Sequence, residues 1–63
     1  MARYRVEFVN GEKIEKTATV VATTPIQAAI KTAGSQVTFR RKQSQWIKVT
    51  PVGASAAYEF VKA

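Results

Sequence analysis

The segment TTPIQAAIKTAG, residues 23–34, carries the strongest structural signal in the chain. Thr24 is a favoured N-cap residue, Pro25 suits the first helical position, and Gln27 completes a T-x-x-Q capping box. Apolar residues then recur at helical spacing: Ile26, Ala29, Ile30 and Ala33. Gly34 is typical of the position that follows a helix. The segment predicts a helix of about two and a half turns, too short to persist alone in water, that must pack on another element.

Two strand-like runs precede this helix. In RYRVEFV, residues 3–9, apolar and charged residues alternate with the period of a half-buried strand. KIEKTATVVAT, residues 13–23, is rich in β-branched residues, and its even-numbered positions are mostly apolar. The Asn-Gly dipeptide between the two runs predicts a β-hairpin.

The loop length of this hairpin follows from which residues must share a face. A two-residue loop at the Asn-Gly dipeptide would bring charged residues beside the core aromatic Phe8, since cross-strand partners lie on the same face. A three-residue loop, residues 9–11, pairs Val6 with the apolar Ile14. We therefore expect the three-residue loop, with Gly11 as the left-handed residue of a bulge.

Three further strand-like runs follow the helix: VTFRR (37–41), QWIKVTPV (45–52) and AAYEFVK (56–62). Polar residues join the first two runs, which predicts a hairpin over residues 40–48. Pro51 cannot donate to a ladder and indicates an edge strand or a strand end. The sequence thus predicts an α+β fold in one domain, residues 1–63. Its small antiparallel sheet has four to five strands, with one helix packed on one face in the order β-β-α-β-β.

Composition limits how so small a chain is stabilised. The 63 residues include no cysteine and no histidine, so disulfides and the usual structural zinc sites are excluded and no cofactor is expected. Stability must come from an apolar core or a partner. The N-terminus does not resemble a signal peptide, and no apolar run approaches the roughly 18 residues that cross a bilayer. We expect a cytoplasmic protein with no membrane partner, or a virion-associated one if the chain is phage-encoded.

Few residues here suit catalysis. Histidine, cysteine and aspartate are absent, and three of the four glutamates, Glu7, Glu12 and Glu15, cluster around the first predicted hairpin. A catalytic carboxylate needs burial or a cleft that shifts its pKa, whereas these three are expected on the solvated face among lysines. Isolated glycines form no phosphate-binding loop. We predict a non-enzyme.

The stretch FRRKQSQWIK, residues 39–48, is the candidate binding site. Ten lysines and arginines against four glutamates give a net charge of +6, a field that attracts phosphates or acidic surfaces. The predicted nucleic-acid-binding residues are Arg40, Arg41, Lys42, Trp46, Lys48, Arg3 and Arg5. Alternation places Trp46 with Lys48, opposite Ile47, which favours an indole exposed on the side without the helix. The competing interpretation is a buried Trp46 with cations that only coat a loop.

These residues predict a small module that docks on nucleic acid with little sequence specificity. Successive cations can contact phosphates, and Trp46 can stack on an unpaired base. DNA and RNA, and single and double strands, all remain open. One alternative is a module that binds a host or virion protein through an exposed sheet edge. Another is a small DNA-compacting protein.

The order of elements resembles that of the small T7-type bacteriophage inhibitor of host RNA polymerase. The resemblance covers YRVEFVNGEKIEKTATVVATTPIQAAIKTAG, residues 4–34, and the later run WIKVTP, residues 46–51. It implies a compact sheet with one helix and a phage-type accessory protein that binds a large partner such as a polymerase or a capsid. That family presents an acidic surface, whereas this chain is basic, so no functional residue is carried over.

Overall fold

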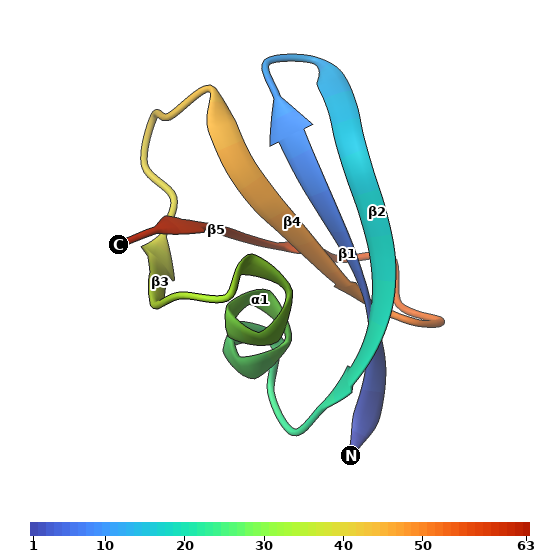
Figure 1. Cartoon of the computed structure of the whole chain (residues 1–63). Helices are drawn as coiled ribbons and strands as arrows, with labels where there is room; N and C mark the ends of the chain where they lie inside the picture. Colours follow the sequence, from blue (N-terminus) through green and yellow to red (C-terminus); the bar gives the residue numbers. More distant parts are fainter.

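The computed structural model describes residues 1–63, which form one antiparallel sheet and one helix (Figure 1). In chain order the elements are β1 (Ala2–Asn10), β2 (Lys13–Ala22), α1 (Pro25–Ala33), β3 (Val37–Phe39), β4 (Gln45–Pro51) and β5 (Tyr58–Lys62). The five strands lie in the order β2-β1-β4-β5-β3, and each neighbouring pair is antiparallel. The predicted α+β class is confirmed, with five strands.

Helix α1 begins and ends at the predicted residues. The Thr24 side chain accepts a hydrogen bond from the Gln27 backbone N–H at 3.3 Å, as an N-cap does. Gly34 ends the helix in the left-handed conformation, with φ 73°, and its N–H donates to the Ile30 carbonyl at 2.8 Å. The helix is neither long nor apolar enough to span a membrane.

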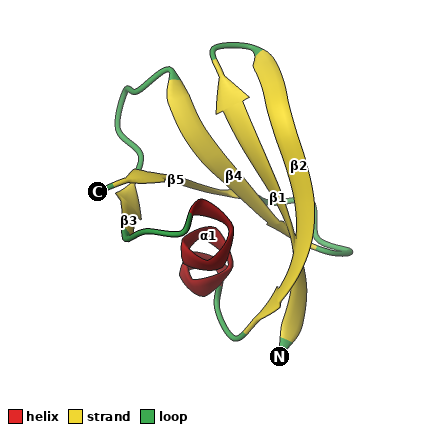
Figure 2. Ribbon diagram, viewed as in Figure 1, coloured by secondary structure: helices red, strands yellow, loops and turns green.

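The helix lies across one face of the sheet, which we call the helix face (Figure 2). Alternate apolar side chains of the strands point to this face, and those buried there are Tyr4, Val6, Ile47, Val49 and Phe60. Ala28 and Ala29 of the helix are fully buried against the sheet, and their small side chains let the helix backbone approach the sheet closely. The opposite side carries no helix, and we call it the open face.

The first hairpin has a shorter turn than predicted. Asn10 pairs with Lys13, so only Gly11 and Glu12 lie in the turn, and the expected three-residue loop was wrong. Gly11 does adopt the expected left-handed conformation, with φ 64°. The glycine therefore supplies positive φ for a tight turn rather than for a longer loop.

The predicted register of this hairpin is also wrong, because Val6 pairs with Ala18 instead of Ile14. Nine residues of β1 pair with ten residues of β2, and the extra residue is Glu15. This β-bulge lets a two-residue turn coexist with an apolar helix face along the rest of β2. It also turns Ile14 onto the open face, where it is 52% exposed.

The bulge places a charged residue of β2 beside an aromatic residue of β1. Lys16 pairs with Phe8, and its ammonium nitrogen lies 5.9 Å from the centroid of the ring. A lysine is tolerated there because its alkyl chain covers apolar surface and its cation faces the ring.

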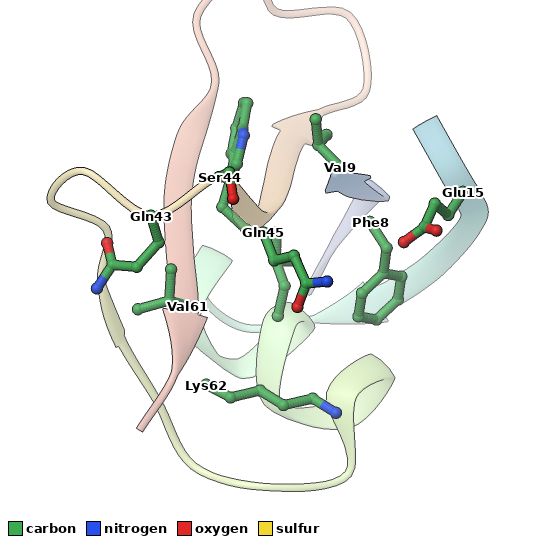
Figure 3. Close-up of a pocket in the computed structure, with 10 residues that line it drawn as sticks. Phe8, Val9, Glu15, Gln43, Ser44, Gln45, Val61 and Lys62 are labelled. Carbon is green, nitrogen blue, oxygen red and sulfur yellow. The ribbon is translucent and has the colours of Figure 1, made fainter. Parts of the chain in front are cut away.

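Strands β3 and β4 do not form the predicted hairpin over residues 40–48, because β5 lies between them. Both are antiparallel to β5, so they run parallel to each other, and residues 40–44 must cross β5. Val61 of β5 alternates with the helix-facing Phe60 and lies on the open face, yet it is only 6% exposed. The crossing segment, residues 40–44, accounts for this burial, since its Gln43 lies beside Val61 (Figure 3).

Candidate functional site

Arg40 fastens the crossing segment to the open face. Its guanidinium carbon lies 4.3 Å from the centroid of the Trp46 ring. Its Nε donates to the Gln43 carbonyl at 3.0 Å, and its Nη1 lies 2.9 Å from Glu59 Oε1. The Arg40 backbone N–H also donates to the Glu59 carbonyl, at 3.1 Å. Because its side chain already has these partners, Arg40 acts as an anchor more than as a free ligand for phosphate.

Trp46 lies on the open face, as the alternation predicted. It pairs with Val9 of β1, which is 8% exposed, so the indole covers apolar surface between strands. Arg40 stacks on the ring, and Trp46 as a whole is half-buried. An unpaired base can reach the face of the ring that Arg40 covers only by displacing Arg40.

A row of alternating charges crosses the open face from strand to strand. Glu7 of β1 pairs with Lys48 of β4, which pairs in turn with Glu59 of β5 beside Arg40. The expectation that Glu7 lies on the solvated surface was wrong, since Glu7 is 6% exposed. The Arg5 guanidinium lies 3.8 Å from its carboxylate. Two cations and two anions in this row cancel, so the row orders the face without adding net charge.

Four of the predicted site residues remain exposed cations: Arg3, Arg5, Arg41 and Lys42. The first two project from β1 onto the open face, and the other two belong to the crossing segment. Together with Arg40 and Lys48, this side of the molecule holds six cations and two glutamates, so 6 − 2 = +4. The remaining four cations and two glutamates give 4 − 2 = +2. The structure thus places Arg3, Arg5, Arg40, Trp46 and Lys48 on the open face, and Arg41 and Lys42 in the crossing segment beside it.

A pocket of about 580 Å³ opens where the crossing segment meets the turn between β1 and β2 (Figure 3). The Gly11 N–H donates to the Ser44 carbonyl at 2.7 Å and ties these two segments together. Glu15 and Lys62 are the titratable residues of the lining. No three His, Cys, Asp or Glu side chains gather in the chain as a metal site would need.

Sequence reasoning missed two features of this region. Glu59, the partner of Arg40, was not assigned a role, because its neighbours depend on which strands flank β5. The second feature is the side of the sheet on which Tyr58 and Phe60 lie, which depends on how β5 pairs with β4. The register places Phe60 and Tyr58 on the helix face, opposite Trp46.

Replacing Arg40 with alanine should uncover the only tryptophan of the chain. We expect the Trp46 emission of Arg40→Ala to move to longer wavelength and its quenching by acrylamide to increase, because the stacked guanidinium is removed. The free energy of unfolding should fall by about 1–2 kcal/mol, since a cation–π contact and a charged hydrogen bond are lost. Fluorescence and urea denaturation measure the two effects.

Arg41→Ala is the matched control, because the Arg41 side chain makes no hydrogen bond or ion pair and only its backbone N–H bonds to Gln43. Its emission spectrum should match that of the wild type. Identical spectra for Arg40→Ala and the wild type would contradict the anchoring role of Arg40.

Comparison of the chain with protein-family models, curated proteins and solved structures found no match. The resemblance of layout to the T7-type polymerase inhibitor therefore stays a prediction. The function has to be argued from the site itself.

Proposed function

We propose that this protein is a small non-enzymatic module that binds nucleic acid through the open face and the crossing segment. The observation that carries the proposal is the charge distribution: one side of the sheet holds +4 of the net +6. A surface of one dominant sign attracts a polyanion and speeds its encounter. Nucleic acid is the polyanion whose regular charges best match a spread of separate cations.

The exposed cations are the residues that would contact phosphates. Arg3 and Arg5 stand on β1, and Arg41 and Lys42 stand on the crossing segment. Arginine offers a forked donor group that suits phosphate oxygens, while lysine acts as a point charge. Lys48 adds charge from between its two glutamates.

Trp46 and Arg40 have a structural role in this site. The stacked pair holds the crossing segment, and with it Arg41 and Lys42, in a fixed position on the sheet. We expect little sequence specificity, because helix α1 packs on the opposite face and contains no arginine that could read bases.

Titration of a labelled oligonucleotide of about a dozen nucleotides, single-stranded and duplex, tests this proposal at low salt. Binding of either form, seen as an increase in fluorescence anisotropy, supports the open face as a nucleic-acid interface. An absence of binding to both forms at low salt contradicts it.

A protein-binding role is the second candidate, and the free edge of β2 favours it. The Val52 N–H donates to the Arg3 carbonyl at 3.0 Å, so the backbone polar groups of Arg3 point toward β4. Arg3 pairs with Val21, whose own N–H and carbonyl therefore point away from β1. The same alternation turns Thr17 and Thr19 outward. Lys31 Nζ donates to the Val21 carbonyl at 2.9 Å, which agrees with this orientation.

An unpaired edge of this kind can accept an added strand from a partner. The stretch Thr17–Ala22 contains no charge, proline or glycine that would discourage pairing. A phage-type accessory protein that binds a polymerase or a capsid could use this edge.

Thr19→Pro tests this second candidate, because the Thr19 N–H points outward and its loss costs no bond to β1. We expect Thr19→Pro to retain the fold and to lose a partner that adds a strand. Thr19→Val keeps the N–H and should retain that partner. Pull-down of polymerase or capsid proteins from nuclease-treated host lysate measures the difference, and equal capture by both variants would exclude strand addition at β2.

A further inference from the structure

Three aromatic rings form a ladder on the helix face at the β3 edge of the sheet. Phe39 of β3 pairs with Phe60 of β5, and their ring centroids lie 5.5 Å apart with an interplanar angle of 29°. Tyr58 stacks on the other side of Phe60, at 6.5 Å and 18°. The central ring is 2% exposed, whereas Phe39 is 69% exposed and Tyr58 is 47% exposed. The two outer rings are therefore open to a ligand.

Helix α1 leaves the two outer rings of this ladder exposed. Its first turn, at Pro25 and Ile26, forms one wall of an apolar depression of about 190 Å³, and the three rings form the rest. Phe39 and Tyr58 stand on either side of Phe60, and a contiguous apolar patch of this kind on a small protein marks an interaction site. No element of the chain covers them.

The charges beside the ladder indicate what binds there. Phe39 is the last residue of an edge strand, and Arg40, Arg41 and Lys42 follow it directly. The Arg40 backbone is held at β5 by its bond to the Glu59 carbonyl, so the crossing segment starts at this edge. Exposed rings beside cations are the combination that binds single-stranded nucleic acid, since the rings stack on bases while the cations neutralise phosphates. A duplex buries its base faces in its own stack and cannot use the rings.

We propose that Phe39 and Tyr58 stack on unpaired bases of a single-stranded nucleic acid that passes around the β3 edge of the sheet. Its phosphates then reach Arg41 and Lys42, where the crossing segment leaves this edge for the open face. This inference rests on the proposed function and adds to it a preference for single strands, over and above the phosphate binding that a duplex shares. It also transfers the stacking role from Trp46, whose ring is covered by Arg40, to two rings that are free.

The wild-type protein tests this without any substitution. We compare a thymidine oligonucleotide of about a dozen nucleotides, an abasic strand of equal length, and a duplex of equal length, all at the same salt. The abasic strand keeps every phosphate and lacks the bases. We expect the thymidine strand to bind at least about tenfold more tightly than the abasic strand, given the usual contribution of one stacked base.

The double variant Phe39→Leu with Tyr58→Leu locates the effect. Leucine keeps the surface apolar and leaves Phe60 in the core, but it removes the two outer rings. Binding of the thymidine strand should fall at least about tenfold, to the level of the abasic strand, whereas binding of the duplex should not change.

The outcomes separate this inference from the proposed function. Equal wild-type affinity for thymidine and abasic strands would overturn base stacking and leave phosphate binding intact. No binding of any of the three ligands would overturn the proposed function itself. Self-association of the wild type that the double variant abolishes, without a change in thymidine binding, would assign the ladder to a second copy of the chain and overturn the inference.

Discussion

Raising the salt concentration from about 50 mM to about 200 mM should weaken binding about 150-fold for duplex and about 50-fold for single strands. These values follow from the four exposed cations of the site: Arg3, Arg5, Arg41 and Lys42. Each phosphate contact releases condensed counterions, so the logarithm of the affinity falls with the logarithm of the salt concentration. The slope is about 0.9 per contact for duplex and about 0.7 for single strands. Anisotropy titrations at several salt concentrations measure the slope.

The slope also tests whether the charges of Glu7, Lys48, Glu59 and Arg40 on the open face cancel. Arg40 lies 2.9 Å from Glu59 and Lys48 stands between two glutamates, and both are partly buried, so they should add little to the number of released ions. Arg5 lies 3.8 Å from Glu7, but its side chain is 60% exposed, so it counts as a contact. A duplex slope near 3.6 in magnitude agrees with four contacts, whereas a slope near zero would mean that affinity does not come from phosphates.

Local signals in the sequence were sufficient to predict most of the fold. The helix was placed correctly because its N-cap, first-turn proline and C-terminal glycine all lie within one short segment. The alternation in residues 3–9 gave the two faces of β1. Of the two alternatives that Pro51 indicated, the strand end is found, whereas β4 is not an edge strand. Each of these features depends on neighbours in the chain.

The strand order could not be predicted in this way. Strands that follow each other in sequence usually lie side by side, which favoured a hairpin between β3 and β4. One signal did point against it: among the residue types that dominate tight turns, residues 40–44 contain only a serine, Ser44. The inserted β5 is held by contacts between distant residues, above all Arg40 with Glu59.

In the candidate site, too, some features depend on neighbours in the chain and others on contacts between distant residues. The side of the sheet on which Trp46 lies followed from alternation with Ile47, a local property. The contact of Arg40 with the Trp46 ring could not be predicted from local alternation, because that contact exists only when the crossing segment passes over β5. The exposed ladder of Phe39 and Tyr58 likewise arises only when β3 pairs with β5.

Removing the two cations of the crossing segment should weaken binding strongly. Arg41→Gln with Lys42→Gln deletes two exposed contacts and leaves the Arg40 anchor intact. Two lost contacts should lower affinity on the order of 100-fold at about 50 mM salt. Lys13→Gln with Lys16→Gln is the matched control, because it removes the same charge from two β2 residues whose partners, Asn10 and Phe8, belong to the helix-face alternation of β1.

The salt dependence of these two variants is the most direct measurement of whether the crossing segment binds phosphates. The duplex slope of Arg41→Gln with Lys42→Gln should be smaller than that of the wild type by about 1.8. The slope of Lys13→Gln with Lys16→Gln should equal that of the wild type. Equal slopes and equal affinities for both variants would show that nucleic acid is attracted by net charge alone, and would contradict a binding site on the open face.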